Sequence, residues 1–218
     1  MEFRILGPLE ISSGGQACAI AGAKERAVLV YLLLHAGQAV SADRLIDELW
    51  GDEPPEAARN SLQVRVAGLR RVLGRERIVS GSGGYQIRIG PEELDLRRFE
   101  ELTAGGDLDE ALALWRGPPL PEFRDEHWAA PAIARLEELR LVALENRVES
   151  DLEMGRHAQL VGELEGLVAE HPLRERVRAQ LMLALYRSGR QAEALEVYRE
   201  GRSALVDQLG IEPGPALQ

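Results

Sequence analysis

The sequence has few of the residue types that build enzyme and metal sites. Its single cysteine, Cys18, excludes a disulfide within the chain. Its histidines lack the spacing of metal ligands: His35, His127, His157 and His171. No nucleophile stands at a useful spacing from a base, and acidic pairs such as Glu137-Glu138 are typical of helix surfaces. We therefore expect no metal, no cofactor and no enzymatic activity.

Long apolar runs are also missing. No segment approaches about 18 uninterrupted apolar residues, the length typical of a membrane-spanning helix. The beginning, MEFRILGPL, has no basic stretch followed by an apolar one, as a secretory signal would. The sequence therefore predicts a cytoplasmic protein with no membrane partner.

Lysine is nearly absent, and the charge is unevenly distributed. Arginine supplies 25 of the 26 basic residues, and the net charge is −10. Residues 1–91 hold 11 basic and 10 acidic side chains, whereas residues 92–218 hold 15 and 26. Within residues 59–88, seven arginines accompany one acid, Glu76. A local basic patch of this kind is typical of a surface that binds phosphate.

The patch is centred on an expected amphipathic helix, RNSLQVRVAGLRRVLGR, over residues 59–75. Its apolar residues recur at helical spacing and form one stripe: Leu62, Val66, Leu69 and Leu73. The remaining face carries the hydrogen-bonding residues Arg59, Asn60, Gln63, Arg70 and Arg71 beside the apolar Val64 and Ala67, and it carries no acid. Such a face can read base edges and grip phosphates, although an ordinary solvated surface has the same composition.

The neighbouring segments predict a winged helix-turn-helix around that helix. Short strands are expected over residues 3–20, a helix over 24–35, and a second helix over 42–50 that Ser41 caps. After the third helix, RIVSGSGGYQIRIG predicts a β-hairpin. The run SGSGG is read as its turn rather than as a phosphate loop, because no helix and no GK[ST] follow it.

The second half of the chain predicts stacked helix pairs. Gly155-Arg156 and Gly189-Arg190 stand 34 residues apart, each between two helical segments, which is the tetratricopeptide period. A related turn is expected at Gly106-Asp107. The expected core residues are Leu152, Leu160, Leu164, Leu183, Leu185, Ala194, Leu195 and Tyr198. The acidic surface of residues 92–218 favours a basic partner.

The segments FRILGPLEI, VSADRLIDELWGDEPPEAARNSLQVRVAGLRRVLG and IVSGSGGYQIRI together resemble the OmpR-type winged helix of Streptomyces antibiotic regulatory proteins. From ELDLRRFEEL onward the chain is similar to the bacterial transcriptional activation domain of that family. The resemblance implies an α+β winged helix-turn-helix in residues 1–91, followed by an all-α, tetratricopeptide-like domain in residues 92–218. It also implies an activator that binds promoter direct repeats, two protomers side by side, in control of antibiotic biosynthesis.

Candidate DNA contacts follow from the chemistry of base edges and phosphates. We expect Asn60 and Gln63 to read adenine, Val64 a thymine methyl, and Arg59, Arg70 or Arg71 guanine or phosphate. Phosphate or wing contacts are expected from Lys24, Arg26, Arg77, Arg88, Ser82 and Arg65. A solvated surface role is the alternative for the first four, and a packing role is the alternative for Arg65. The resemblance implies that the loop at Asp52 and Glu53, together with the helical domain, contacts RNA polymerase and its sigma factor; the alternative is that this loop is a plain connector.

Two departures from the family leave other functions open. The wing has Gly81 and Ser82 where relatives commonly carry a basic residue, and the third helix has Ala67-Gly68 where they usually carry Arg or Lys. These changes predict a weaker grip on phosphate. One alternative is a non-catalytic adaptor whose winged helix binds protein. Another is a repressor gated by a small molecule in the helical domain.

Overall fold

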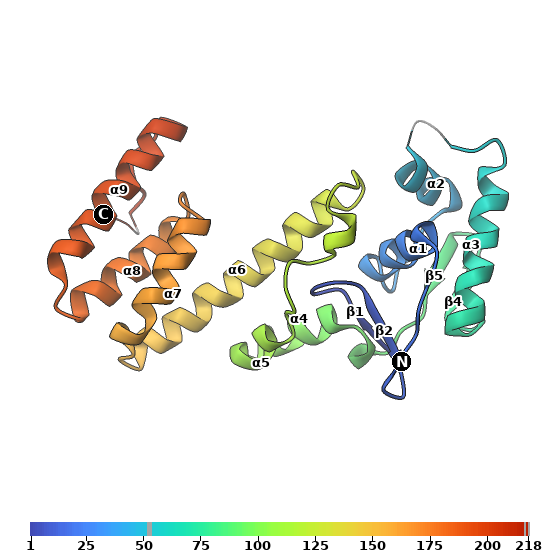
Figure 1. Cartoon of the computed structure of the whole chain (residues 1–218), viewed down its shortest axis with the longest axis horizontal. Coiled ribbons are helices and arrows are strands. Elements are labelled where there is room, and N and C mark those ends of the chain that lie inside the picture. The colour runs from blue at the N-terminus through green and yellow to red at the C-terminus, as the bar shows by residue number, and fades with distance from the viewer. Residues whose placement is uncertain (52–53, 216, 218) are drawn as a thin grey trace. The chain divides into compact units, whose positions relative to one another are not determined.

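The computed structural model describes residues 1–51, 54–215 and 217 of the chain. The chain forms two compact units, Met1–Arg140 and Leu141–Gln218, and the border between them falls inside helix α6 (Ala130–Glu153). The first unit contains the strands and the helices α1 to α5 that are labelled in Figure 1. The second contains the end of α6 together with α7, α8 and α9.

A small antiparallel sheet begins the first unit. Its strands, in the order β1-β2-β3, are β1 (Glu2–Arg4), β2 (Glu10–Ser13) and β3 (Gln16–Ala17). Phe3 pairs with Ile11 in register, and both side chains are buried while their strand neighbours Glu2, Arg4 and Glu10 are exposed. This alternation is that of a sheet with one buried face. The short N-terminal strands that the sequence predicted are therefore present.

Three helices form the centre of the winged-helix part. In α1 (Ala23–Leu34) every residue from Ala27 to Leu33 is buried. Helix α2 (Ala42–Trp50) begins at Ser41, whose side chain accepts the Arg44 N–H at 3.1 Å, so the predicted cap is confirmed. Helix α3 (Ala58–Leu73) packs against both α1 and α2. The predicted helices are therefore confirmed, with ends within one or two residues.

The predicted hairpin is also present. It consists of β4 (Ile78–Gly81) and β5 (Gly84–Ile87), with Ile78 opposite Ile87 and both side chains buried. Val40 and Tyr85 exchange two backbone hydrogen bonds of 2.8 Å, which attach β5 to the connection between α1 and α2. The hairpin is thus held by backbone pairing on a second side.

The chain then forms shorter elements before α6. These are the 3-10 turn η1 (Pro91–Glu93), α4 (Asp95–Gly105), α5 (Leu108–Ala113) and the 3-10 turn η2 (Pro121–Phe123). The predicted turn at Gly106-Asp107 separates α4 from α5, and Gly106 adopts a left-handed φ of +88°. Phe99 and Trp115 pack edge to face, with ring centroids 5.4 Å apart, and close this part of the core.

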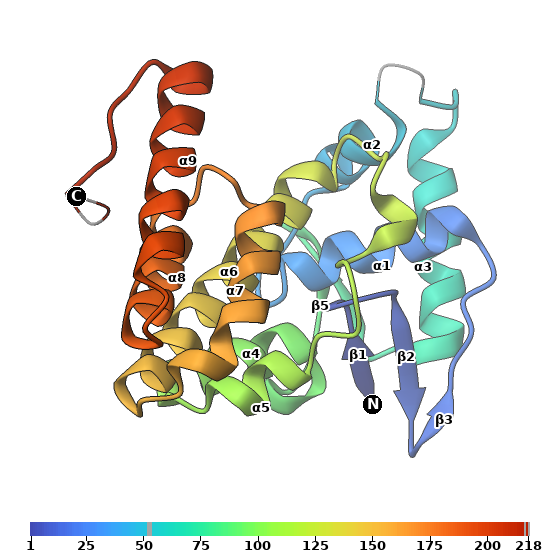
Figure 2. The same cartoon turned by 60° about the vertical axis from the view of Figure 1, so that its left-hand side comes forward.

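The second unit is helical throughout its described residues apart from turns and the final segment. Besides the end of α6 it consists of α7 (His157–Glu170), α8 (Glu175–Arg187) and α9 (Gln191–Leu209), and α8 packs against both α7 and α9 (Figure 2). Gly155 and Gly189 occupy the two predicted turns with φ near +80°. The predicted fold class, a winged helix followed by helical repeats, is confirmed.

The predicted core of the second unit needs correction at two positions. Leu183 is 37% exposed and Leu195 is 55% exposed, whereas the other predicted leucines of this core are buried. Together with Tyr186 they line an open, largely apolar groove of about 430 Å³ on α8 and α9. Helical spacing shows which residues lie on one face of a helix, but it does not show whether another helix packs against that face. No described helix covers the face of α8 and α9 that carries Leu183 and Leu195.

Candidate nucleic-acid interface

Helix α3 is fixed by one side. The residues of the predicted apolar stripe are at most 3% exposed: Leu62, Val66, Leu69 and Leu73. They pack in the core between α3, α1 and α2. The orientation of α3 about its own axis is therefore determined by burial, and so is the face that it presents to solvent.

That face carries the residues expected to read bases. The structure brings five exposed side chains together on it: Asn60, Gln63, Val64, Ala67 and Arg71. Val64 is 57% exposed, although it is apolar. No described residue bonds to the side chains of Asn60, Gln63 or Arg71, so their donors and acceptors are available to a ligand.

Arg59 is exposed but paired. Its guanidinium lies 2.6 Å from a carboxylate oxygen of Asp43 in α2, and both side chains are about 70% exposed. An ion pair in water at this exposure contributes little to stability, about 0 to 1 kcal/mol. A phosphate can therefore replace Asp43 as the partner of Arg59 at small cost.

Arg70 differs from the other arginines of α3, because it contacts the wing. Its Nε donates to the backbone carbonyl of Ile78 at 2.8 Å, and one terminal nitrogen donates to the Ser80 hydroxyl at 2.7 Å. Both acceptors belong to β4. Arg70 thus joins α3 to the hairpin, a role that the sequence did not indicate.

Arg65 points to the other flank of α3 and pairs with Glu25 of α1 at 2.8 Å. Burial opposes ionisation of Glu25, but the hydrogen bond from Arg65 and its charge lower the pKa of that carboxyl overall. Of the two roles expected for Arg65, phosphate contact or packing, this geometry favours packing.

The expected phosphate contacts on α1 are partly occupied. Lys24 donates to the Leu49 carbonyl at 2.6 Å, and its ammonium lies 5.8 Å from the ring centroid of Trp50. It therefore satisfies a carbonyl at the C-terminal end of α2, where a positive charge is favoured. Arg26 is half-buried.

The basic residues of the hairpin fall into two groups. Arg77 donates to both carboxylate oxygens of Glu93, one of them at 2.7 Å, and its side chain is 23% exposed. Arg88 and Ser82 are exposed, and no described residue bonds to either side chain. The hairpin therefore offers Arg88 and Ser82 to solvent, while Arg77 holds the segment that follows.

The Arg77–Glu93 pair should make the free energy of unfolding depend on pH in the acidic range. The Arg77 guanidinium holds the pKa of Glu93 at about 2, below its ordinary value of 4.5. Ionised Glu93 therefore stabilises the fold above pH 4.5, and this contribution is lost as the pH falls through about 2. Urea unfolding should show that Glu93→Gln is less stable than wild type at neutral pH and that the difference shrinks in acid. A difference that is independent of pH would contradict the assignment.

At Gly68 we expect a substitution to increase stability, in contrast to Glu93→Gln. Its backbone is ordinary helix, and a Cβ built there meets only Glu25 Cγ, at 3.9 Å, which is normal van der Waals contact. Gly68→Ala should therefore raise the free energy of unfolding by about 0.5–1 kcal/mol, the usual helix-propensity difference. Thermal unfolding measures it, with Gly162→Ala in α7 as the comparison, since nothing lies within 4 Å of a Cβ built at that position. A loss of stability at Gly68 alone would show a contact that the geometry lacks.

Comparison with known proteins identifies both parts of the chain. Residues 17–86 match the family described as "Transcriptional regulatory protein, C terminal", and residues 93–218 match the "Bacterial transcriptional activator domain". The regulatory protein DnrI of Streptomyces peucetius is 38% identical over 243 residues, which cover all of this chain and 89% of DnrI. The chain belongs to the Streptomyces antibiotic regulatory protein family.

Other members of this family are considerably longer. The regulatory protein AfsR of Streptomyces griseus is 41% identical over the whole of this chain, which spans only 24% of AfsR. The structure of Mycobacterium tuberculosis EmbR in complex with a low-affinity phosphopeptide superimposes with a TM-score of 0.91 at 35% identity. That alignment covers 99% of this chain and 62% of the EmbR chain.

Both matched domains are those of transcriptional regulators, a class distinct from enzymes. Among the described residues, no group of three or more potential metal-ligating side chains lies close enough to hold an ion. None of the described helices has the length and apolar character to cross a membrane. Asp52 and Glu53, the expected polymerase-contacting pair of this family, lie outside the described residues.

Sequence reasoning missed the residues that hold this interface in place. Arg70, Lys24 and Arg77 were expected to contact DNA, and the structure gives each a partner within the protein. Lys24 lies at the start of α1, and no sequence pattern marks the Leu49 carbonyl at the end of α2 as its partner. No sequence pattern marks Asp95, which lies outside the winged helix, as a buried polar residue.

Proposed function

We propose that the chain is a sequence-specific DNA-binding activator of transcription, in which α3 enters the major groove and the β4–β5 hairpin lies along the backbone. The observation that carries the proposal is the exposed face of α3. Asn60, Gln63 and Arg71 present unpaired polar groups there beside the exposed Val64, on a helix whose other side is buried. This combination matches adenine, guanine and the thymine methyl.

The roles of the arginines follow from their partners. Arg71 and Arg59 are proposed to contact guanine or phosphate, and Arg88 with Ser82 to contact phosphate beside the wing. Arg70 is proposed to act on DNA mainly through the hairpin that it holds, by its bonds to Ile78 and Ser80. Arg26 and Arg65 remain proposed phosphate contacts of second rank, and Lys24 and Arg77 can reach phosphate only by leaving their present partners.

The biological setting is part of the same proposal. Family membership supports binding of two protomers side by side on promoter direct repeats, recruitment of RNA polymerase with its sigma factor, and control of a pathway of secondary metabolism. Asp52 and Glu53 stay the proposed polymerase contacts. We also propose that residues 1–91 and 92–218 divide the labour between DNA binding and activation. Such a protein acts where the bacterial chromosome is, in the cytoplasm.

A salt titration tests the DNA-binding role. DNA sites selected from a randomised pool should bind with an affinity that falls linearly with salt on a log–log plot, with a slope near −0.9 for each phosphate contacted. In vitro transcription from such a site, with RNA polymerase of the source organism, should rise when the protein is added. No selected site, or binding that does not change with salt, would refute the proposal.

One observation favours the adaptor as a second candidate. Five of the basic residues expected to contact DNA are engaged within the protein: Lys24, Arg59, Arg65, Arg70 and Arg77. If the winged helix docks a protein, the titration above gives no specific DNA complex. The same outcome thus separates the two candidates.

A further inference from the structure

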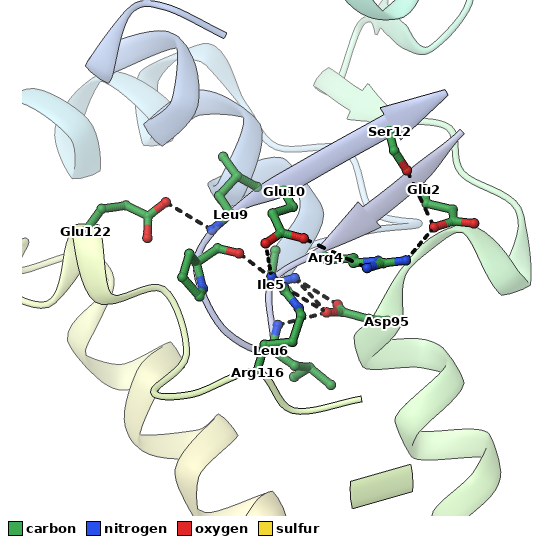
Figure 3. Close-up of polar contacts among 11 residues, drawn as sticks. Glu2, Arg4, Ile5, Leu6, Leu9, Glu10, Ser12, Asp95, Arg116 and Glu122 are labelled. Atoms are coloured by element: carbon green, nitrogen blue, oxygen red, sulfur yellow. Dashed lines mark hydrogen bonds and ion pairs between the residues drawn. The ribbon is translucent and has the colours of Figure 1, made fainter. Parts of the chain in front are cut away.

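A short strap joins β1 to β2 and is hydrogen-bonded to residues far along the chain. We define the strap as residues 5–9; its first two side chains, Ile5 and Leu6, are fully buried. Asp95, the first residue of α4, is only 7% exposed and lies against it (Figure 3). Both carboxylate oxygens of Asp95 accept the Ile5 N–H at 2.9 Å, and one also accepts the Leu6 N–H at 2.9 Å.

The segment after α5 binds the rest of the strap. The backbone N–H of Arg116 donates to the Leu6 carbonyl at 2.9 Å, and that of Leu120 donates to the Gly7 carbonyl at 2.8 Å. The Arg116 guanidinium donates to the Pro8 carbonyl at 3.1 Å. The Leu9 N–H donates to a Glu122 carboxylate oxygen at 3.0 Å. Each residue of the strap therefore has a backbone group bonded to residues 95–122.

Asp95 is the buried centre of this arrangement. Burial raises the pKa of its carboxyl, while the two strap N–H groups and the Arg116 charge, 3.7 Å away, oppose that rise. Removing the carboxylate would leave two buried N–H groups without an acceptor, which is unfavourable. The bonds also cross a domain border, because Asp95 lies in the matched activator domain (93–218) and the strap lies ahead of the matched winged helix (17–86).

A second contact joins the same two parts. Tyr31 of α1 packs against Trp128, with ring centroids 5.8 Å apart, and Trp128 also packs against Phe123 at 5.3 Å. This apolar contact does not involve Asp95. We therefore expect the helices after the wing to stay attached when Asp95 is changed, while the strap loses its bonds to the first residue of α4.

We propose that Asp95 is a positioning residue that couples DNA binding to activation, by holding α4, α5 and the segment through Glu122 in one orientation relative to the winged helix. The inference rests on the proposed function. An activation surface held rigidly beside bound DNA meets polymerase at a high effective concentration, which a loosened attachment reduces. DNA affinity depends on α3 and the hairpin and is left unchanged.

The test separates DNA binding from activation. Asp95→Ala should bind the selected DNA site with an affinity within about twofold of wild type. At full occupancy of that site, shown by footprinting, the transcript yield should be at least about fivefold lower than with wild type. Asp95→Asn, which keeps one acceptor oxygen, should fall between the two. The matched control is Glu110→Ala, which removes an exposed carboxylate that pairs with Arg98 at 2.8 Å and touches no strap residue. It should activate as wild type does.

The outcomes are distinct. Full activation by Asp95→Ala at full occupancy would overturn the inference, and so would a parallel loss of DNA affinity and activation in both Asp95 variants, which marks a purely structural role. If circular dichroism shows that Asp95→Ala is unfolded, Asp95→Asn and Arg116→Leu carry the same comparison. If wild type itself binds no DNA or activates no transcription, the proposed function fails first. If wild type does both, only the coupling is in question.

Discussion

Replacing Gln63 by alanine is expected to weaken binding to the selected DNA site by about tenfold or more and to relax the preference for one base pair. The reason is that a side-chain amide that pairs with adenine discriminates against other bases by about 1–3 kcal/mol. Gln63 is exposed on the face of α3 opposite the buried stripe, and no described residue occupies its amide. The affinity can be measured by fluorescence anisotropy on the site and on single-base variants of it.

Arg71→Ala is the matched comparison for Gln63→Ala. A phosphate contact carries no sequence information, so its loss should weaken all sites alike and reduce the salt slope by about 0.9. Gln63→Ala should leave that slope unchanged. If Gln63→Ala binds every variant site as wild type does, α3 presents a different face to the groove. If Arg71→Ala alters preference at a single base pair instead, Arg71 reads guanine.

Replacing Gly84 by alanine is expected to detach the hairpin and to destabilise the first unit by about 3 kcal/mol. Gly84 has a φ of +112°, which L side chains rarely adopt. A Cβ there would lie 2.0 Å from the Val40 carbonyl oxygen and 2.6 Å from Ser41 Cα, both backbone atoms that cannot move independently. The two hydrogen bonds between Val40 and Tyr85 must therefore break or lengthen. Thermal unfolding and amide exchange at Tyr85 measure the effect.

The control stands directly across the hairpin. Gly81 pairs with Gly84 in register, but its φ is ordinary and nothing lies within 4 Å of a Cβ placed on it. Gly81→Ala should be about as stable as wild type. Equal stability of the Gly81 and Gly84 variants would show that the chain relieves the contact without strain. DNA affinity should follow the same order, because a detached hairpin no longer places Arg88 and Ser82.

Periodicity predicted the elements of this chain well, because local burial patterns determine them. The stripe of Leu62, Val66, Leu69 and Leu73 is buried as expected. Ser41 caps its helix, and the hairpin turns within SGSGG. Each of these features depends on residues within a few positions of one another, so a short window of sequence contains the information.

Partners of side chains could not be predicted in the same way. Arg70 and Arg71 are neighbours of one chemical type, yet Arg70 bonds to β4 and Arg71 is exposed. The difference of one position turns the side chain by about 100° around the helix, and only the position of the hairpin decides what it meets. The Asp95 contacts to Ile5 and Leu6 join residues about ninety positions apart. The prediction that Leu183 and Leu195 are buried was wrong for a similar reason, because helical spacing does not show whether another helix packs against a face.

The lysine contact described above has a consequence for chemical modification of the protein. Lys24 carries the only side-chain amine in the sequence, and that amine donates to the Leu49 carbonyl. Reagents that acylate or crosslink lysine can therefore act on one side chain only, and each product breaks the contact at the end of α2. A crosslink from lysine to DNA or polymerase would therefore show that the Lys24 Nζ lies within crosslinking distance of that partner. Guanidine-directed reagents, by contrast, meet 25 arginines, including those of the proposed DNA-binding face.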